Sequence, residues 1–324
     1  MSENQSWRRI LLALLAPVAV VGYGVWKWPT VVSAGGALVD ARLGWLVAGA
    51  CAIALTYVAG AASQQGAVVP DLPRRRLFLA QLAGVSANAV LPAGIGSAVV
   101  AHGFLRRCGV SRAGAVAAVA LNGFAGVVFH VVVLLALAAT APDRLPIHRP
   151  AFGPMWIVVG AAVVLAVAGA LGWARASGRG RAIVRGIGRQ WAAMREVLAD
   201  RRRMALLCGG AAAVPLLHAM TLGAVLHAIG RPLPVVDVLI AYFAASAVTA
   251  LVPSPGSVGG LDLMLGVTLA GVGADTQTAM AAVLGYRLLA SWLPLLPSAL
   301  ALAHLRARSG AHPRGNLSDR IRVA

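Results

Sequence analysis

The chain has 324 residues, of which 59% are apolar and only 12% are charged, and its mean hydropathy is +0.80. These values lie outside the range of soluble globular proteins and predict an all-α protein that crosses a membrane several times. The formal net charge is +18, but the arginines cluster between apolar runs, where anionic headgroups are the nearest counterions, so we expect a membrane rather than a nucleic acid as partner.

Apolar stretches of about 20 residues mark the expected membrane spans. In chain order they are residues 9–28, 43–63, 113–139, 154–174, 204–229 and 277–304. Two further apolar regions, 77–105 and 237–270, are each broken near the middle by proline and glycine. We therefore expect about six full transmembrane helices and two broken regions.

The distribution of arginine predicts the orientation, because positive residues in short loops stay cytoplasmic. Most arginines gather before the first span, at 74–76, at 106–112, at 175–203 and after the last span. The loops that remain hold only Lys27, Arg42, Arg144, Arg149 and Arg231. Both termini are therefore expected in the cytoplasm. Region 77–105 should enter from the cytoplasm and return to it, whereas 237–270 should enter from outside and return there.

The two broken regions resemble each other in sequence. The break LPAGIGS (91–97) precedes a half-helix, a polar turn and a full span, and VPSPGSVGG (252–260) is followed by the same order. The first unit covers about 77–139 and the second about 237–305. Similar units of opposite orientation predict an inverted-topology repeat with two re-entrant helical hairpins and a midplane site between them. Kinked helices in a passive bundle are the alternative reading.

The domain organisation is predicted to be simple. We expect a single integral membrane domain over 1–306 and a disordered basic C-terminal tail over 307–324. Within the loop 175–203, apolar residues at helical spacing alternate with arginines, which predicts an amphipathic basic helix on the anionic cytoplasmic leaflet. A solvated charged face is the alternative for that loop.

Apart from histidines, Asp262 and Arg287 are the ionisable residues deep inside the apolar spans. Such groups are costly in hydrocarbon and indicate function by default. Counting inward from the outer turn at 1.5 Å per residue puts them at depths of about 15 and 18 Å, so the two side chains are expected to pair. With Gly260 as N-cap, Asp262 would also lie in the first turn of a helix, where the helix dipole alone could explain it.

Candidate substrate-binding residues surround the two breaks. Ser97 as an N-cap would leave backbone amides available, which makes LPAGIGS the better anion cradle. Asn88 and Asn122 are predicted either to line the cavity or to hydrogen-bond between helices. The full candidate set is Asp262, Arg287, Pro253, Pro255, Gly256, Gly259, Gly260, Pro92, Gly94, Gly96, Ser97, Asn88 and Asn122. We expect no metal site and no cofactor, because the histidines and the three cysteines lack ligand spacing.

The order of PAGIG (92–96), LRRCGVS (105–111), PSPGSVGGLD (253–262) and AMAAVLGYRLLASWLP (279–294) resembles the flippase-like family that includes the transmembrane domain of lysylphosphatidylglycerol synthases. The resemblance covers about residues 42–305. It implies a multi-pass protein of the bacterial inner membrane that moves a phospholipid or a lipid-linked precursor between leaflets. The soluble aminoacyl-transferase domain of the synthases is not expected here.

The chain departs from the family pattern in its first half. The acid and the following arginine of the second half are kept as Asp262 and Arg287, with Ser257 in place of a glycine. In the first half, Ala98 and Ala101 stand at charged positions, and Asn122-Gly123 stands where the family has an Asp-Arg pair. The charges of the first half are therefore lost.

Two functional classes remain open. The first is a carrier of an anionic phospholipid or lipid-linked precursor, which the retained second-half site favours. The second is a non-transporting membrane subunit that scaffolds or regulates a partner enzyme, such as a glycosyltransferase or lipid-modifying enzyme, which the lost first-half charges favour. The chain itself is not expected to be an enzyme, because its sequence offers no nucleophile–base pair, glycine-rich nucleotide loop or metal cluster.

Overall fold

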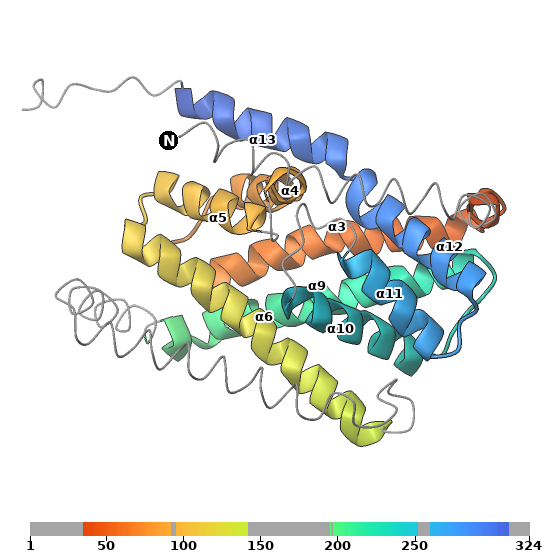
Figure 1. The fold of residues 1–324 in the computed structure, drawn as a ribbon. Helices are drawn as coiled ribbons and strands as arrows, with labels where there is room; N and C mark the ends of the chain where they lie inside the picture. Colours follow the sequence, from red (N-terminus) through yellow and green to blue (C-terminus); the bar gives the residue numbers. More distant parts are fainter. Residues whose placement is uncertain (1–34, 92–94, 142–194, 196, 252–259, 311–324) are drawn as a thin grey trace, which may run out of the picture.

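The computed structural model describes residues 35–91, 95–141, 195, 197–251 and 260–310, and the regular structure in these ranges is entirely helical (Figure 1). The elements are α3 (Leu43–Gly66), α4 (Arg74–Val90), α5 (Gly96–Arg107), α6 (Arg112–Thr140), α9 (Arg201–Ala228), α10 (Val235–Leu251), α11 (Gly260–Gly271), α12 (Thr276–Arg287), the π-helix η4 (Leu288–Trp292) and α13 (Leu295–Gly310).

Four helical segments are long and apolar enough to cross a membrane: α3, α6, α9 and the run Thr276–Leu305. They coincide with four of the predicted spans. The predicted spans 9–28 and 154–174 lie outside the described residues. On α6 many large apolar side chains face outward, with Phe124 66% and Leu135 65% exposed, as expected for a helix that contacts lipid. The chain is therefore an all-helical, multi-pass membrane protein.

The last predicted span, 277–304, is not one regular helix. The α-helix α12 ends at Arg287 and passes into η4, where the amide of Leu293 donates to the carbonyl of Leu288 at 2.8 Å. A short turn at Leu293 and Pro294 then leads into α13. A proline lacks the amide that would continue the helix, and π-turns are common sites of helix bending. Figure 1 shows the chain bending between α12 and α13.

The antiparallel helices α3 and α9 form the centre of the bundle (Figure 1). Two glycines let their backbones meet. A Cβ added at Gly66 would overlap the backbone of Leu207, and one added at Gly210 would overlap the carbonyl oxygen of Ala59. Small residues at contact points are the usual means by which membrane helices approach closely, since lipid provides no hydrophobic driving force.

Two helix pairs flank this centre. Helices α4 and α5 meet where Gly96 presses against the backbone of Ala87, with no room for a Cβ. Helices α10 and α11 are joined by Thr268, whose Oγ1 donates to the carbonyl of Ala241 at 2.9 Å. The α4–α5 pair is connected to the end of the bundle where α3 ends and α6 begins, and the α10–α11 pair to the end where α9 ends and α12 begins (Figure 1).

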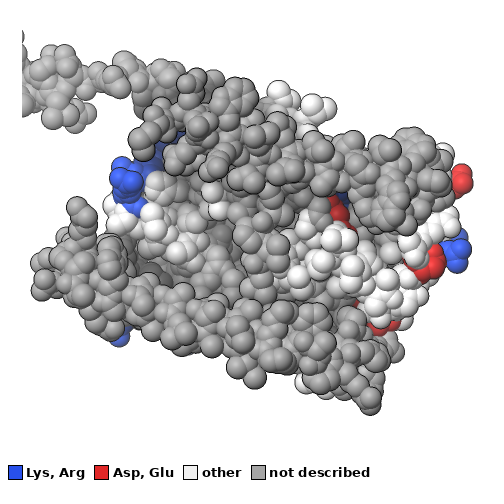
Figure 2. All heavy atoms as spheres, in the orientation of Figure 1, with Lys and Arg blue, Asp and Glu red and all other residues white. Residues whose placement is uncertain are grey.

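The two ends of the bundle differ in charge. Figure 2 shows arginine atoms at the left end of the molecule, and aspartate atoms beside arginine atoms at the right end. The end where α9 begins carries the arginines at 74–76, 106, 107, 112 and 201–203, and the other end carries Asp40, Asp237 and Asp275 with Arg42 and Arg231. The described arginine clusters among those that predicted the orientation therefore share one end, called the arginine-rich end below.

Two predicted boundaries are wrong by a few residues. The basic loop was expected to continue to residue 203, but α9 begins at Arg201 because Asp200 caps it, accepting from the amides of Arg202 at 2.8 Å and Arg203 at 3.4 Å. The C-terminal tail was expected from 307, but α13 continues to Gly310. The predicted amphipathic segment 175–194 and the tail 311–324 lie outside the described residues.

Candidate functional site

Asp262 and Arg287 form the predicted ion pair. The guanidinium of Arg287 makes a bidentate contact with the carboxylate of Asp262: Nε donates to Oδ1 at 2.8 Å, and Nη2 donates to Oδ2. The Asp262 side chain is 22% exposed and that of Arg287 13% exposed. Arg287 Nη1 also donates to Ser291 Oγ at 3.3 Å. The two-pronged geometry is the strong form of this contact and fixes both side chains in one plane.

Local structure explains how the two residues meet. Asp262 lies in the first turn of α11, as predicted, although Gly260 is the first helical residue and not the N-cap. Arg287 is the last residue of α12, at the entry to the π-helix that carries Ser291. The position of Asp262 therefore agrees with both explanations predicted from the sequence, because its carboxylate lies at the positive end of a helix and also pairs with an arginine.

A cluster of three aromatic and imidazole side chains lies next to Arg287. Tyr286 Oη lies 3.0 Å from Nδ1 of His218, and the ring of Tyr242 stacks on His218 with centroids 5.9 Å apart and planes 10° apart. These residues come from α12, α9 and α10, so the cluster joins three helices beside the ion pair. Sequence reasoning missed it. The feature of the sequence that could have indicated this cluster is that Tyr286 directly precedes Arg287.

At the first break, Ser97 is not the N-cap that was predicted. Helix α5 begins at Gly96 after Ile95, because Gly96 packs against the backbone of Ala87 and fixes the start of the helix there. The amide of Ser97 donates to Asn88 Oδ1 at 2.8 Å. One amide that was expected to be free for an anion is therefore already bonded. Pro92 and Gly94 lie outside the described residues.

Asn122 takes part in a junction of three helices. Its Oδ1 accepts a hydrogen bond from Ser63 Oγ, which also approaches the carbonyl oxygen of Leu207 at 3.0 Å. These residues belong to α6, α3 and α9. Of the two roles predicted for Asn122, the structure shows the hydrogen bond between helices. At the second break, Pro253, Pro255, Gly256 and Gly259 lie outside the described residues.

A cavity of about 820 Å³ opens at the arginine-rich end, and no described residue of either break lines it. It lies between the end of α3, the α3–α4 connection and the first turns of α4 and α9. Charged side chains from Asp71 to Arg75 and from Asp200 to Arg203 line it together with apolar side chains. The sequence analysis did not predict this cavity. The feature of the sequence that could have indicated it is the pair of arginine triplets at the starts of α4 and α9.

Helices that can span a membrane, outward-facing apolar side chains and a largely buried ion pair define the class of protein as a polytopic α-helical membrane protein. The family model for the lysylphosphatidylglycerol synthase TM region matches residues 9–298 of the sequence, so the chain belongs to that family. The predicted resemblance is confirmed, and the match also covers the predicted first span. The comparison with curated proteins returned no match.

Proposed function

We propose that the protein carries a phospholipid or a lipid-linked precursor between the leaflets of the bacterial inner membrane. The observation that carries this proposal is the Asp262–Arg287 pair, which lies in a bundle that is otherwise largely apolar. A membrane protein that only needs stability gains little from such a pair, because desolvation of two charges offsets their attraction. Ionisable groups kept inside a membrane mark substrate paths or switches by default.

The path is proposed to run between two re-entrant hairpins, α4–α5 and α10–α11. Each pair is connected to one end of the bundle, and the two pairs use opposite ends, which supports an inverted repeat of α4–α6 and α10–α13. The breaks of both pairs would then meet near the midplane. Both termini are proposed to face the cytoplasm, on the side of the arginine-rich end.

The ion pair is proposed to act as an exchangeable latch. In the empty carrier, Asp262 neutralises Arg287 and keeps the site closed. A headgroup phosphate, like a carboxylate, has two oxygens that can accept two parallel hydrogen bonds from one guanidinium, so it can replace Asp262 on Arg287. Asp262 then remains at the N-terminus of α11, where the helix dipole stabilises its charge. No bond is made or broken, so the protein is proposed to work without catalysis and without a cofactor.

Reconstitution tests the carrier function. The purified chain is inserted into liposomes that contain a trace of headgroup-labelled phospholipid, and a membrane-impermeant quencher is added outside. Carriage exposes label from the inner leaflet, so quenching should pass the level seen in liposomes without protein. The assay is repeated with labelled phosphatidylglycerol, phosphatidylethanolamine and a polyprenyl phosphate. Quenching that stays at the protein-free level for all of them would refute the proposal.

A second function is favoured by the first half of the chain. There Asn122 holds three helices together, and Ala98 and Ala101 stand at positions that are charged in the family pattern. A half-site that has become purely structural fits a membrane subunit that scaffolds a glycosyltransferase or lipid-modifying enzyme. Mild-detergent purification discriminates the two functions. The subunit role predicts an enzyme recovered in a fixed ratio to the chain, together with no lipid transfer in liposomes.

A further inference from the structure

The cavity at the arginine-rich end grades from charged to apolar along its depth. Its charged lining residues lie in the α3–α4 connection and at the first turns of α4 and α9. Apart from Leu72 in that connection, its apolar lining residues lie along the helices. Val58, for example, precedes the end of α3 at Gly66 by eight residues, which is about 12 Å at 1.5 Å per residue. Such a gradient matches an amphiphile and not a small soluble ion.

The charged rim of the cavity contains arginines whose side chains are available to bind an anion. Four arginines and two aspartates line the cavity. Arg203 is occupied, because it pairs with Asp200 at 3.1 Å and donates to the carbonyl of Val68. Among the residues the structure describes, the side chains of Arg74, Arg75 and Arg202 make no hydrogen bond or ion pair, and all three are exposed. Asp200 is also occupied as the cap of α9.

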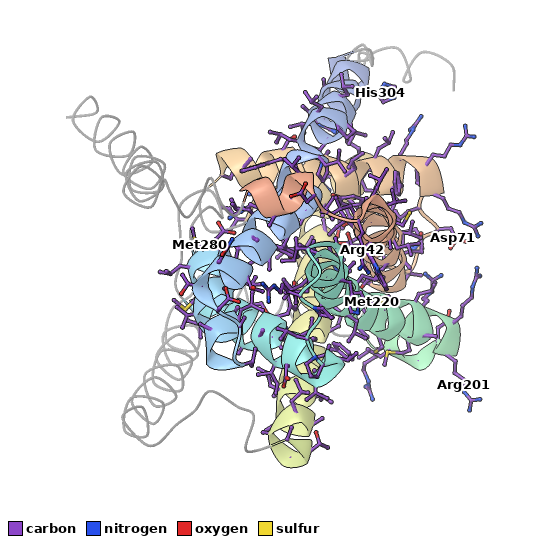
Figure 3. The ribbon with its side chains drawn as sticks, turned by 90° about the vertical axis from the view of Figure 1, so that its right-hand side faces the viewer. Arg42, Asp71, Arg201, Met220, Met280 and His304 are labelled. Atoms are coloured by element: carbon purple, nitrogen blue, oxygen red, sulfur yellow. The ribbon has the colours of Figure 1, made fainter. Side chains whose placement is uncertain are left out.

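The backbone adds to the positive potential at this rim. Helix α4 begins there with Pro73 before it and without a side-chain cap, so the amides of its first turn have no capping side chain. Figure 3 shows Asp71 and Arg201, which mark the α3–α4 connection and the start of α9, on the same side of the molecule with their side chains directed outward. The rim therefore opens to the surroundings of the bundle.

We propose that this cavity binds one anionic glycerophospholipid from the adjacent leaflet, with its phosphate on Arg74, Arg75 and Arg202 and an acyl chain along Val58, Phe78 and Leu206. Its volume of about 820 Å³ suits a headgroup and the upper part of a chain. The site lies outside the proposed midplane path. It is occupied whether or not the protein carries lipid between leaflets, so its failure and the failure of the carrier function are separate results.

Lipid binding to the purified full chain tests this site. Dioleoyl phosphatidylglycerol is titrated into the detergent-solubilised protein, and bound lipid is counted by native mass spectrometry. The variant Arg74→Gln/Arg75→Gln/Arg202→Gln removes the rim charges. The control Arg76→Gln/Arg112→Gln/Arg201→Gln removes the same charge from exposed arginines at the same end that do not line the cavity. Affinity should fall about tenfold or more in the first variant and change less than about twofold in the control.

A second pair of variants tests the acyl chain. Val58→Trp fills the apolar wall of the cavity, and Val47→Trp places the same bulk on the same helix outside it; the two valines are 53% and 52% exposed, so both changes are tolerable. Val58→Trp should weaken phosphatidylglycerol binding, and Val47→Trp should not. Equal loss in both arginine variants, equal affinity for phosphatidylcholine, no effect of Val58→Trp, or full displacement by soluble glycerol phosphate would each overturn the proposal.

Discussion

Substitution Asp262→Asn breaks the ion pair with the least change in shape. It removes the charge that faces two donors of Arg287, and the guanidinium stays inside the bundle. Removing one partner of a buried pair costs about 3–5 kcal/mol, because the remaining charge loses its counterion. Since the two side chains are 22% and 13% exposed, we expect the lower end, about 3 kcal/mol.

The partner substitution is expected to cost less. In Arg287→Gln the remaining charge is Asp262 in the first turn of α11, where the helix dipole stabilises a carboxylate by about 0.3–1 kcal/mol. In the double variant Asp262→Asn/Arg287→Gln neither charge remains, so its loss of stability should be smaller than that of Asp262→Asn alone. The coupling between the two sites is then about 0.5–3 kcal/mol, the range for residues in direct contact.

Unfolding of the four proteins in mixed detergent, followed by circular dichroism, measures this coupling. Asp40→Asn is the control, because Asp40 is exposed and its side chain has no hydrogen bond or ion pair among the described residues. Losses that simply add in the double variant, or an Asp262→Asn protein as stable as the control, would refute the argument that the pair is desolvated and coupled.

Three further predictions concern the scaffold around the site. Gly210→Ala should destabilise the protein by about 1–3 kcal/mol, because its Cβ would overlap Ala59 and Ser63, whereas the neighbouring Gly209→Ala, which has open space, should leave the melting temperature unchanged. Asn88→Ala should cost about 1 kcal/mol and loosen the start of α5, measured as faster amide exchange at Ser97, while Asn88→Asp, which keeps the acceptor, should restore protection. Asp275 caps α12 through the amide of Thr278 at 2.9 Å and its hydroxyl at 2.7 Å, and the backbone bond to Thr278 is the main reason that the pKa of Asp275 lies below its ordinary value. The stability that Asp275 contributes to the folded protein is therefore present above the ordinary pKa of aspartate and lost as pH falls through the lower folded-state pKa. The difference in melting temperature between the wild type and Asp275→Ala should be constant at neutral pH and shrink in acid. A difference independent of pH would contradict the capping role.

The ion pair was predictable because both of its residues lie in regular helix. A constant rise of 1.5 Å per residue from a shared turn gave Asp262 and Arg287 similar depths without any knowledge of packing. The start of α5 was not predictable in the same way. It depends on the contact of Gly96 with Ala87 and on the side chain of Asn88, which only the folded hairpin brings together.

The features that the sequence analysis missed arise between helices. The cluster of His218, Tyr242 and Tyr286 draws one side chain from each of three helices, so its prediction requires the rotation of each helix about its axis. The bend after Arg287 had a visible signal in Pro294, but the π-turn before it lies in a largely apolar run without proline or glycine. The cavity at the arginine-rich end likewise depends on how the first turns of α4 and α9 lie around the end of α3.

Lipid transfer by variants of the ion pair tests the central claim most directly. Wild type, Asp262→Asn, Arg287→Gln and the charge-exchanged Asp262→Arg/Arg287→Asp protein are reconstituted at equal density, after each is shown to be folded by circular dichroism. The latch predicts rapid transfer by the wild type and strongly reduced transfer by all three variants, because the exchanged pair moves the phosphate-binding guanidinium onto α11. Wild-type rates in folded Asp262→Asn and Arg287→Gln would contradict a working role for the pair.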